Sequence, residues 1–336
     1  MRRRSLVTAI ASGALALVLL IALAMFAQVD LTHLLRLLAD VKLLPFAALV
    51  ALMSLHILLA GEKWRLVYRR MVPGAALSRR LCFCFTAIGT AVGQVLPMQL
   101  ATALTRSFCS HLVTGSGAVR GALATAFEQI FDIAVVALCG LASLYCLWSG
   151  DLSRWTAIAG VAIATGFILG GPVLGTAASA SKWLATAHVM LGDRMGRFGR
   201  ALAESGLFEQ KLTRHLFVLS VLRFAVLWLM AIATTYAVGL NVSALQLAAA
   251  LPLVVLATAL AVTPGGIGIN EWTFAAALTA FGADFETATQ FALVNRVLVA
   301  AAALMIGVAG VTLAWLTEKN TVSSPPQSTG HALADR

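Results

Sequence analysis

The chain has 336 residues, of which 60% are hydrophobic and 11% are charged. Because ordinary globular domains carry about 25% charged residues, this composition excludes a soluble enzyme or binding module and indicates an integral membrane protein. The formal net charge of +10 would suit a nucleic acid, but the cations lie between apolar runs, where membrane topology places them. We therefore expect the membrane as a partner, and no nucleic acid.

Apolar runs long enough to cross a bilayer, about 20 residues each, recur along the chain. We expect about eight transmembrane helices, near residues 5–27, 43–60, 80–97, 120–148, 155–180, 215–240, 244–263 and 287–316. The shorter run 272–282 predicts a half-helix. The predicted fold is thus an all-α polytopic membrane domain over residues 1–316, followed by a disordered cytoplasmic tail, 317–336.

The first apolar run follows three arginines and extends from residue 5 to residue 27. This is longer than the 7–15 residues of the apolar region of a signal peptide, so we expect an uncleaved first span. The small residues Ala22–Leu23–Ala24 leave a cleaved signal peptide open as the alternative.

Most Lys and Arg residues gather in three segments between the apolar runs. Under the positive-inside rule, all three segments lie in the cytoplasm, so both termini are predicted to be cytoplasmic in the plasma (inner) membrane. The members are Arg2, Arg3 and Arg4; Lys63, Arg65, Arg69, Arg70, Arg79 and Arg80; and Lys182, Arg194, Arg197, Arg200, Lys211 and Arg214.

Two apolar segments contain a helix-breaking proline, one in each half of the chain. Pro97 interrupts the first, and Pro264 precedes Gly265, Gly266 and Gly268 in the second. Irregular backbone survives at membrane depth only where protein or a water-filled cavity encloses it. We therefore expect broken or re-entrant helices near Pro97 and Pro264. On the topology above they run in opposite directions, as in inverted-repeat transporters.

A helix is predicted to restart at Glu271, directly after the second break. Its first N–H groups and the positive end of its dipole would point into the break, where they could hold an anion. The alternative is a plain tight turn between two helices, with Glu271 or Asn270 capping the second helix.

Ionisable residues inside the apolar runs are costly unless paired or hydrated, so each is a candidate functional residue. Glu128 and Asp132 are four residues apart and share one helix face. Arg223 lies near the middle of its run, and Arg106 follows the first break. With Arg296 and Glu271, these acids and arginines nearly balance, which predicts ion pairs.

Two roles fit these charged residues. The first is structural, with ion pairs that hold the helices together. In the second, Arg296 and Arg106 receive the phosphate of an amphiphilic substrate, since a guanidinium binds phosphate in a bidentate manner and stays charged. The five cysteines and six histidines form no ligand pattern, so we expect no metal and no cofactor.

Several segments occur in the order seen in a known membrane family. They are Gln94–Pro97, Arg106, Phe127–Asp132, Thr263–Glu271 and Asn295–Arg296. In these segments the chain resembles the lysylphosphatidylglycerol synthase transmembrane family, also described as flippase-like. The resemblance covers most of residues 5–316 and is strongest in the Pro-Gly-Gly-Ile-Gly-x-x-Glu run.

The chain departs from the family pattern at two places. Met98–Thr105 stands where the family usually has a Gly-Gly-Asp-like turn, and Glu128–Gln129 stands where many members have Glu-Arg. The Pro264 segment thus follows the family pattern, whereas the Pro97 segment departs from it. The soluble aminoacyltransferase domain of the full-length synthases is missing from this sequence, so the resemblance implies lipid translocation without lysine transfer.

Three classes of function remain open. The favoured one is a flippase-like transporter that moves an anionic lipid, either a phospholipid or a polyprenyl-phosphate-linked lipid, between leaflets. The second is a non-catalytic accessory subunit of a lipid or envelope synthesis pathway. A lipid-modifying transferase is the third, and the sequence shows no convincing catalytic set for it. The predicted head-group site consists of Arg296, Glu271, Gly265, Gly266, Gly268, Arg106, Glu128, Asp132 and Arg223.

Overall fold

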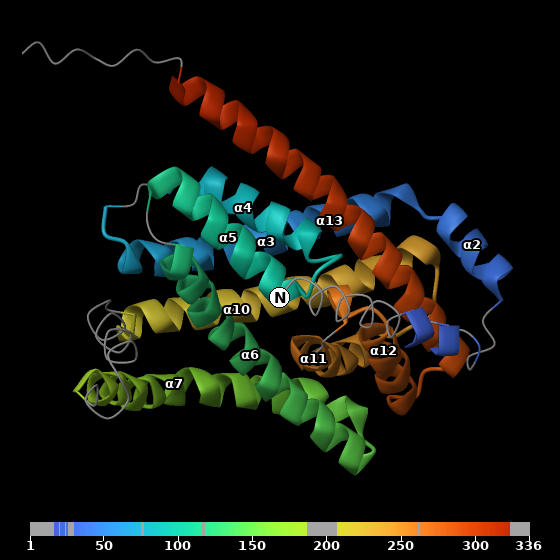
Figure 1. The fold of residues 1–336 in the computed structure, drawn as a ribbon. Helices are drawn as coiled ribbons and strands as arrows, with labels where there is room; N and C mark the ends of the chain where they lie inside the picture. The colour runs from blue at the N-terminus through green and yellow to red at the C-terminus, as the bar shows by residue number, and fades with distance from the viewer. Residues whose placement is uncertain are drawn as a thin grey trace, which may run out of the picture.

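The computed structural model describes residues 17–19, 21–23, 25, 30–74, 77–115, 118–186, 207–260 and 263–322. Over these ranges the regular structure is helical throughout and contains no strand, as the composition predicted (Figure 1). The helices are α2 Leu31–Ala39, α3 Leu43–Met71, α4 Arg79–Val92, α5 Met98–Thr114, α6 Ala118–Ser149, η1 Leu152–Arg154, α7 Trp155–Thr186, α10 Gln210–Val238, α11 Ala244–Leu260, η2 Pro264–Gly266, α12 Ile269–Ala280 and α13 Phe285–Val322.

Five helical segments are long and apolar enough to cross a membrane: Leu43–Met71, Ala118–Ser149, Leu152–Gly170, Gln210–Val238 and Phe285–Leu316. They confirm the polytopic membrane class. The runs predicted at 80–97 and 244–263 form the shorter helices α4 and α11. Most of the predicted span 5–27 lies outside the described residues, as does the tail beyond Val322.

The first proline break forms the tip of a helical hairpin. Helix α4 ends at Val92, residues 93–97 turn the chain, and α5 starts after Pro97. With 14 residues, α4 is about 21 Å long, short of the 30 Å hydrocarbon core. The two helices approach closely at Gly89, where a Cβ would lie 3.2 Å from the Thr102 Cα. The pair forms a helical hairpin of the kind that we expected for a re-entrant segment.

The second proline break has the same form. Helix α11 has 17 residues and α12 has 12, and the two pack against each other on either side of the break at Pro264. The tips of the two hairpins meet, because the Gly265 N–H donates to the Leu96 carbonyl over 3.2 Å. Irregular backbone from one half of the chain is thus in direct contact with irregular backbone from the other.

The two hairpins belong to a repeat with a fixed offset. His56 of α3 and Arg223 of α10 are hydrogen bonded and lie 167 residues apart in the chain. The same number of residues separates Pro97 from Pro264. It also separates the first residue of α3 from that of α10, and the first residue of α6 from that of α13. Helices α3 and α10 also have equal lengths of 29 residues.

The repeat is inverted. Helices α3 and α10 run antiparallel, with the Lys42 N–H donating to the Ala237 carbonyl at one end. At the other end Arg70 pairs with Glu209 at 2.7 Å. The offset exchanges these two contacts, as a twofold axis through the His56–Arg223 contact requires. Likewise α13 packs on α4 and α6 packs on α11.

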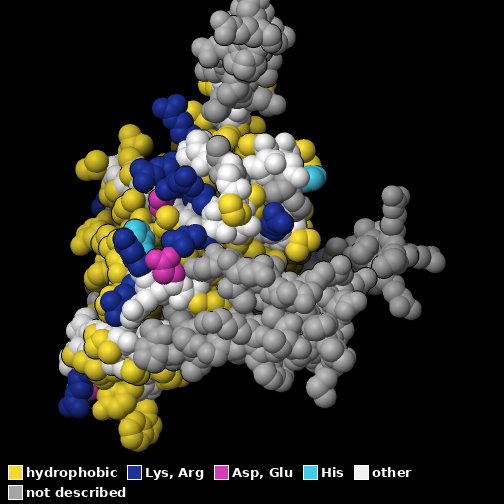
Figure 2. Space-filling model, turned by 90° about the vertical axis from the view of Figure 1, so that its left-hand side faces the viewer, with side chains coloured by type: hydrophobic (Ala, Val, Ile, Leu, Met, Phe, Trp, Pro, Cys, Tyr) yellow, Lys and Arg dark blue, Asp and Glu magenta, His cyan; other side chains and the backbone are white. Residues whose placement is uncertain are grey.

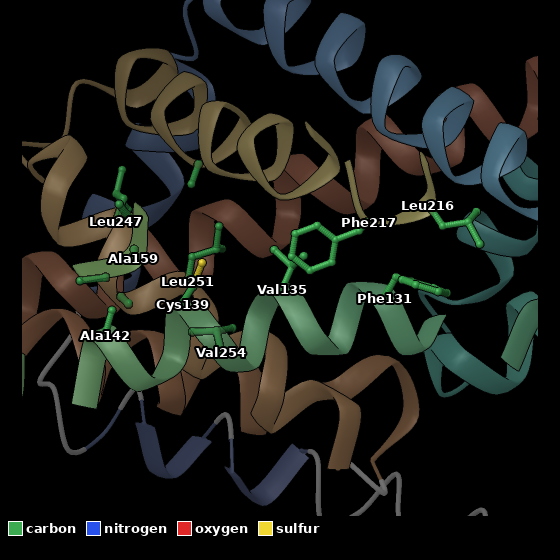
Figure 3. Packing of buried hydrophobic residues seen from close by; sticks show 14 of the residues in the cluster. Phe131, Val135, Cys139, Ala142, Ala159, Leu216, Phe217, Leu247, Leu251 and Val254 are labelled. Atoms are coloured by element: carbon green, nitrogen blue, oxygen red, sulfur yellow. The ribbon is translucent and has the colours of Figure 1, made fainter. Parts of the chain in front are cut away.

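Helix α6 runs through the apolar core. Its residues Phe131, Val135 and Cys139 are buried, and Figure 3 shows them facing Phe217 of α10 and side chains of α11. Four of the five cysteines are buried and all five are free, so they pack as small apolar residues. The core therefore joins α6 of the first half to α10 and α11 of the second.

One end of the molecule is strongly basic. Figure 2 shows Lys and Arg side chains gathered where α3 ends and α10 begins, and the Arg70–Glu209 pair lies there. One member of the predicted basic segment does not belong to this surface. Helix α3 continues to Met71 rather than ending near residue 60, and Lys63 is completely buried inside it.

Candidate functional site

A cavity of about 260 Å³ lies between the two halves of the repeat. We call it the chamber. Helices α3, α4, α5, α6, α10 and α11 line it, and α13 contributes Val299 alone. Its polar and charged lining residues are His56, Thr86, Thr90, Gln94, Gln99, Thr102, Arg106, Glu128, Gln129, Asp132, Ser220, Arg223 and Thr258.

Arg106 and Glu128 form a buried ion pair in the wall of the chamber. The Arg106 Nη1 donates to Glu128 Oε1 over 2.6 Å, and both side chains are at most 2% exposed. The other guanidinium nitrogens donate to the Ala60 carbonyl and the Thr86 hydroxyl, and the guanidinium stacks 5.5 Å from the Trp64 ring centre. These contacts use every Arg106 nitrogen and fix its position.

Lys63 joins the two acids on α6. Its ammonium lies 2.5 Å from Asp132 Oδ1 and 3.4 Å from Glu128 Oε2. A side chain four positions away along a helix lies on the same face, which explains how one ammonium reaches both carboxylates. Lys63 does not line the chamber, so it supplies positive charge from behind the acids.

Arg223 is the charged group most open to the chamber. Its Nη1 donates to Asp132 Oδ2, its Nε donates to His56 Nε2 over 3.1 Å, and its side chain is 25% exposed. Its Nη2 makes no hydrogen bond to any residue that the structure describes. Since His56 Nε2 accepts, the neutral ring carries its proton on Nδ1. Arg223 thus retains a donor for a ligand.

Arg296 holds the two hairpin tips together. Its Nη1 donates to the Gly265 carbonyl over 2.8 Å, and its Nη2 donates to the Gln94 carbonyl over 3.4 Å. Its Nε lies 3.7 Å from Glu271 Oε1. Because these acceptors come from both proline breaks, Arg296 is the side chain that joins the two halves at their irregular backbone.

The close approach of the two hairpin tips requires the glycines of the second break. Gly265 has φ +58°, and a Cβ there would lie 2.5 Å from the Gln94 carbonyl oxygen and 2.6 Å from Arg296 Nη2. Gly266 and Gly268 also have positive φ, +70° and +85°, a conformation that residues with a Cβ rarely adopt. The Pro-Gly-Gly-Ile-Gly sequence therefore serves the close approach of the tips.

Glu271 occupies the position where we expected an anion. Its Oε2 accepts the Gly268 N–H over 2.6 Å, so the N-terminus of α12 is capped by its own carboxylate. Its Oε1 is buried and accepts no hydrogen bond from a described residue; the Arg296 guanidinium is its charged neighbour. The capping alternative describes this residue in the present conformation.

The predicted site residues divide into two neighbouring clusters. Arg106, Glu128, Asp132 and Arg223 surround the chamber, while Gly265, Gly266, Gly268, Glu271 and Arg296 lie at the tips. Each acid pairs with one arginine, as the near-balance of charge predicted. Gln94 connects the clusters, because it lines the chamber and its carbonyl accepts from Arg296.

Sequence reasoning missed His56 and Lys63. Both belong to α3, and with Ala60 they follow the i, i+4, i+7 spacing of a single helix face. The seven-residue spacing of His56 and Lys63, which places both polar side chains on one helix face, was the available signal. Among the described residues, no group of three or more His, Cys, Asp and Glu side chains is placed to hold a metal ion.

Comparison with known proteins agrees with this architecture. The model of the family described as the lysylphosphatidylglycerol synthase TM region matches residues 9–307, which include both hairpins and both charged clusters. Nothing among curated proteins or solved structures matches the chain. The match makes the protein a membrane protein of lipid metabolism or transport, and the chain belongs to the lysylphosphatidylglycerol synthase transmembrane region family.

Proposed function

We propose that the protein moves an anionic lipid between the leaflets of the membrane, with the lipid head group passing through the chamber. The observation that carries this proposal is the charge of the chamber. Three cations, Lys63, Arg106 and Arg223, face two acids on α6. An unmatched positive charge inside a membrane protein is costly, and a phosphate would balance it.

The size of the chamber supports a head group rather than a whole lipid. Pockets that enclose drug-sized ligands measure about 300–1,000 Å³, and the chamber measures about 260 Å³. A phosphate with a small substituent would fit there, while the acyl chains stay in the surrounding lipid. Arg223 would bind the phosphate through its unused donor, since it is the most exposed of the chamber cations.

The hairpin tips provide an element that could respond to the ligand. Arg296 is bound to two backbone carbonyls and stands beside Glu271. Gln94 belongs both to the tips and to the chamber wall, so movement of the head group past Gln94 would disturb the Arg296 contacts. We assign Arg296, Glu271 and the three glycines to the movement of the hairpin tips. We assign Arg106, Glu128, Asp132 and Arg223 to binding of the head group.

The orientation follows from the basic end of the molecule. Applied to the basic surface in Figure 2, the positive-inside rule puts the end of α3 and the start of α10 on the cytoplasmic side of the plasma membrane. The same rule supports cytoplasmic termini. We propose this orientation together with the transport function.

A reconstituted assay tests the proposal. Purified protein is placed in vesicles with fluorescent phosphatidylglycerol in the inner leaflet, and exposure of the head group is followed by quenching from outside. We expect translocation with the native chain and at least a tenfold loss with Arg223→Gln, because the substitution removes the guanidinium that faces the chamber.

Arg154→Gln is the matched control. Arg154 pairs with Asp151 near the start of α7, and its side chain is 61% exposed, so the substitution should leave translocation unchanged. Equal rates for the native chain and for Arg223→Gln, both well above empty vesicles, would contradict a role for the chamber. Absence of translocation by the folded native chain would contradict transport and favour an accessory role in lipid or envelope synthesis.

A further inference from the structure

We propose, resting on the transport function above, that the chamber selects a head group with a single negative charge. The ligand class is a phosphodiester monoanion, as distinct from a zwitterionic head group or a phosphomonoester dianion. Lys63, which does not touch the ligand, sets this preference by fixing the net charge behind the chamber wall.

The charges around the chamber can be counted from their contacts. Glu128 pairs with Arg106 at 2.6 Å, and Asp132 pairs with Arg223. These two pairs are neutral together. Lys63 adds one positive charge, since it contacts both acids and has no acid of its own among the described residues. The formal charge of this cluster is therefore +1.

The neighbouring ionisable groups leave this count unchanged. His56 accepts the Arg223 Nε–H through Nε2, which requires that nitrogen to be unprotonated. Arg296 and Glu271 stand next to each other at the tips and sum to zero. A ligand in the chamber therefore meets a surrounding cluster with a net formal charge of +1.

Three ligand charges give three different outcomes in a low-dielectric site. A monoanion makes the sum zero. A zwitterion leaves the positive charge uncompensated, and a dianion leaves one negative charge in excess. Because uncompensated charge is costly at membrane depth, the monoanion is favoured over both alternatives, and the difference in affinity constitutes the specificity.

Two residues allow the charge to be changed without separating an acid from its arginine. Replacing Lys63 by Met leaves Glu128 with Arg106 and Asp132 with Arg223, and lowers the charge to zero. Gln129 lines the chamber, and the structure gives its side chain no hydrogen bond to a described residue. Gln129→Glu therefore also gives zero, and Gln129→Lys gives +2. The double variant Lys63→Met with Gln129→Lys returns the charge to +1.

The experiment measures binding of soluble short-chain lipids to the full chain in detergent, separately from translocation. The probes are dihexanoyl phosphatidylcholine, phosphatidylglycerol and phosphatidic acid, at a pH above the second pKa of a phosphomonoester, about 6. We expect the native chain to bind phosphatidylglycerol roughly tenfold more tightly than the other two, a difference of about 1.4 kcal/mol.

The lipid preference of each variant should depend on the formal charge of the cluster, whichever residue was replaced. Lys63→Met and Gln129→Glu should both reverse the order, so that phosphatidylcholine binds more tightly than phosphatidylglycerol, because a zwitterion then leaves the sum at zero and a monoanion leaves one negative charge in excess. Gln129→Lys should move the preference toward phosphatidic acid, and the double variant should restore the native order. Since Lys63 and Gln129 lie on different helices, agreement between the two neutral variants excludes local damage as the cause.

Distinct results overturn the inference and the function on which it rests. If the native chain binds and translocates lipid, but its preference is the same in all folded variants, the charge rule is wrong and transport stands. A double variant that behaves like Lys63→Met would also overturn the rule. If the native chain binds none of the three lipids and translocates none, both proposals fail.

Discussion

The two halves of the molecule have the same arrangement of helices but carry different polar and charged residues at matching positions. With the 167-residue offset, Glu128 and Gln129 of α6 correspond to Asn295 and Arg296 of α13. The first half places an acid in the chamber wall, whereas the second half places an arginine on the tips. The order of the helices, the proline breaks and the helix packing thus repeat along the chain, while the charged groups do not.

The difference also explains why the chamber is one-sided. Helices α3 and α10 line it with the corresponding residues His56 and Arg223. The corresponding helices α4 and α11 also both line it, but α5 and α6 of the first half contribute many lining residues, whereas their counterparts α12 and α13 contribute only Val299 among the described residues. The counterpart region of the second half is filled by the contacts of Arg296 with Gly265 and Gln94.

The largest expected effect comes from separating the buried pair of the first half. Arg106→Leu takes from Glu128 its 2.6 Å guanidinium contact and leaves only the more distant Lys63 ammonium, at 3.4 Å, among the described cations, so it should lower the free energy of unfolding by about 3–5 kcal/mol. Thermal unfolding in detergent measures this loss. Adding Glu128→Leu should recover most of the stability, because an apolar pair replaces the buried charges. A double variant no more stable than Arg106→Leu would contradict the pairing.

The second effect lies at the tips. Gly265→Ala places a Cβ against the Gln94 carbonyl and requires a left-handed conformation, so we expect a loss of about 3 kcal/mol in stability. Gly115→Ala is the control, because Gly115 also has positive φ but open space around it; it should cost about 1 kcal/mol. Equal losses in the two variants, measured by unfolding, would show that the tips do not approach as closely as described.

Replacing Arg296, which holds the two hairpin tips together, should lower the free energy of unfolding by a smaller amount. Arg296→Gln loses the charged donor to two carbonyls, and its side chain is 22% exposed, so we expect about 1–2 kcal/mol. The informative measurement is hydrogen exchange at residues 93–97 and 263–268. Exchange should rise in both segments together. A rise in one segment alone would mean that Arg296 does not join the two halves.

The smallest effect is expected at the basic end. Arg70→Ala removes the surface pair with Glu209, whose side chains are 47% and 43% exposed. Such pairs contribute about 0–1 kcal/mol, so the unfolding temperature should barely change. A loss comparable with that of Arg106→Leu would show that this end of the α3–α10 contact is buried in a larger assembly.

Local patterns predicted much of this structure. The prolines and glycines marked both breaks, and the four-residue spacing of Glu128 and Asp132 placed both acids on one face. Lys63 was misassigned because the apolar run of α3 ends near residue 60, while the helix continues to Met71. A basic residue in the last turns of a helix looks the same in sequence whether it faces solvent or the core.

Long-range contacts were beyond the reach of the sequence pattern. No local sequence pattern predicts that Arg296 binds carbonyls of both breaks. The same is true of the pairing of Arg106 with Glu128 and of Arg223 with Asp132. These partners depend on the antiparallel packing of α3 on α10, which brings together residues 167 positions apart. Pro97 and Pro264 are separated by this offset, but two prolines alone do not establish a repeat, and the residues around them differ between the two halves.

The most direct test of the chamber as a head-group site is an experimental structure of the full chain with dihexanoyl phosphatidylglycerol. We expect phosphate density in the chamber within hydrogen-bond distance of the Arg223 guanidinium, with the acyl chains outside. Phosphate found only on the outer surface, with the chamber occupied by water or by protein side chains, would contradict it.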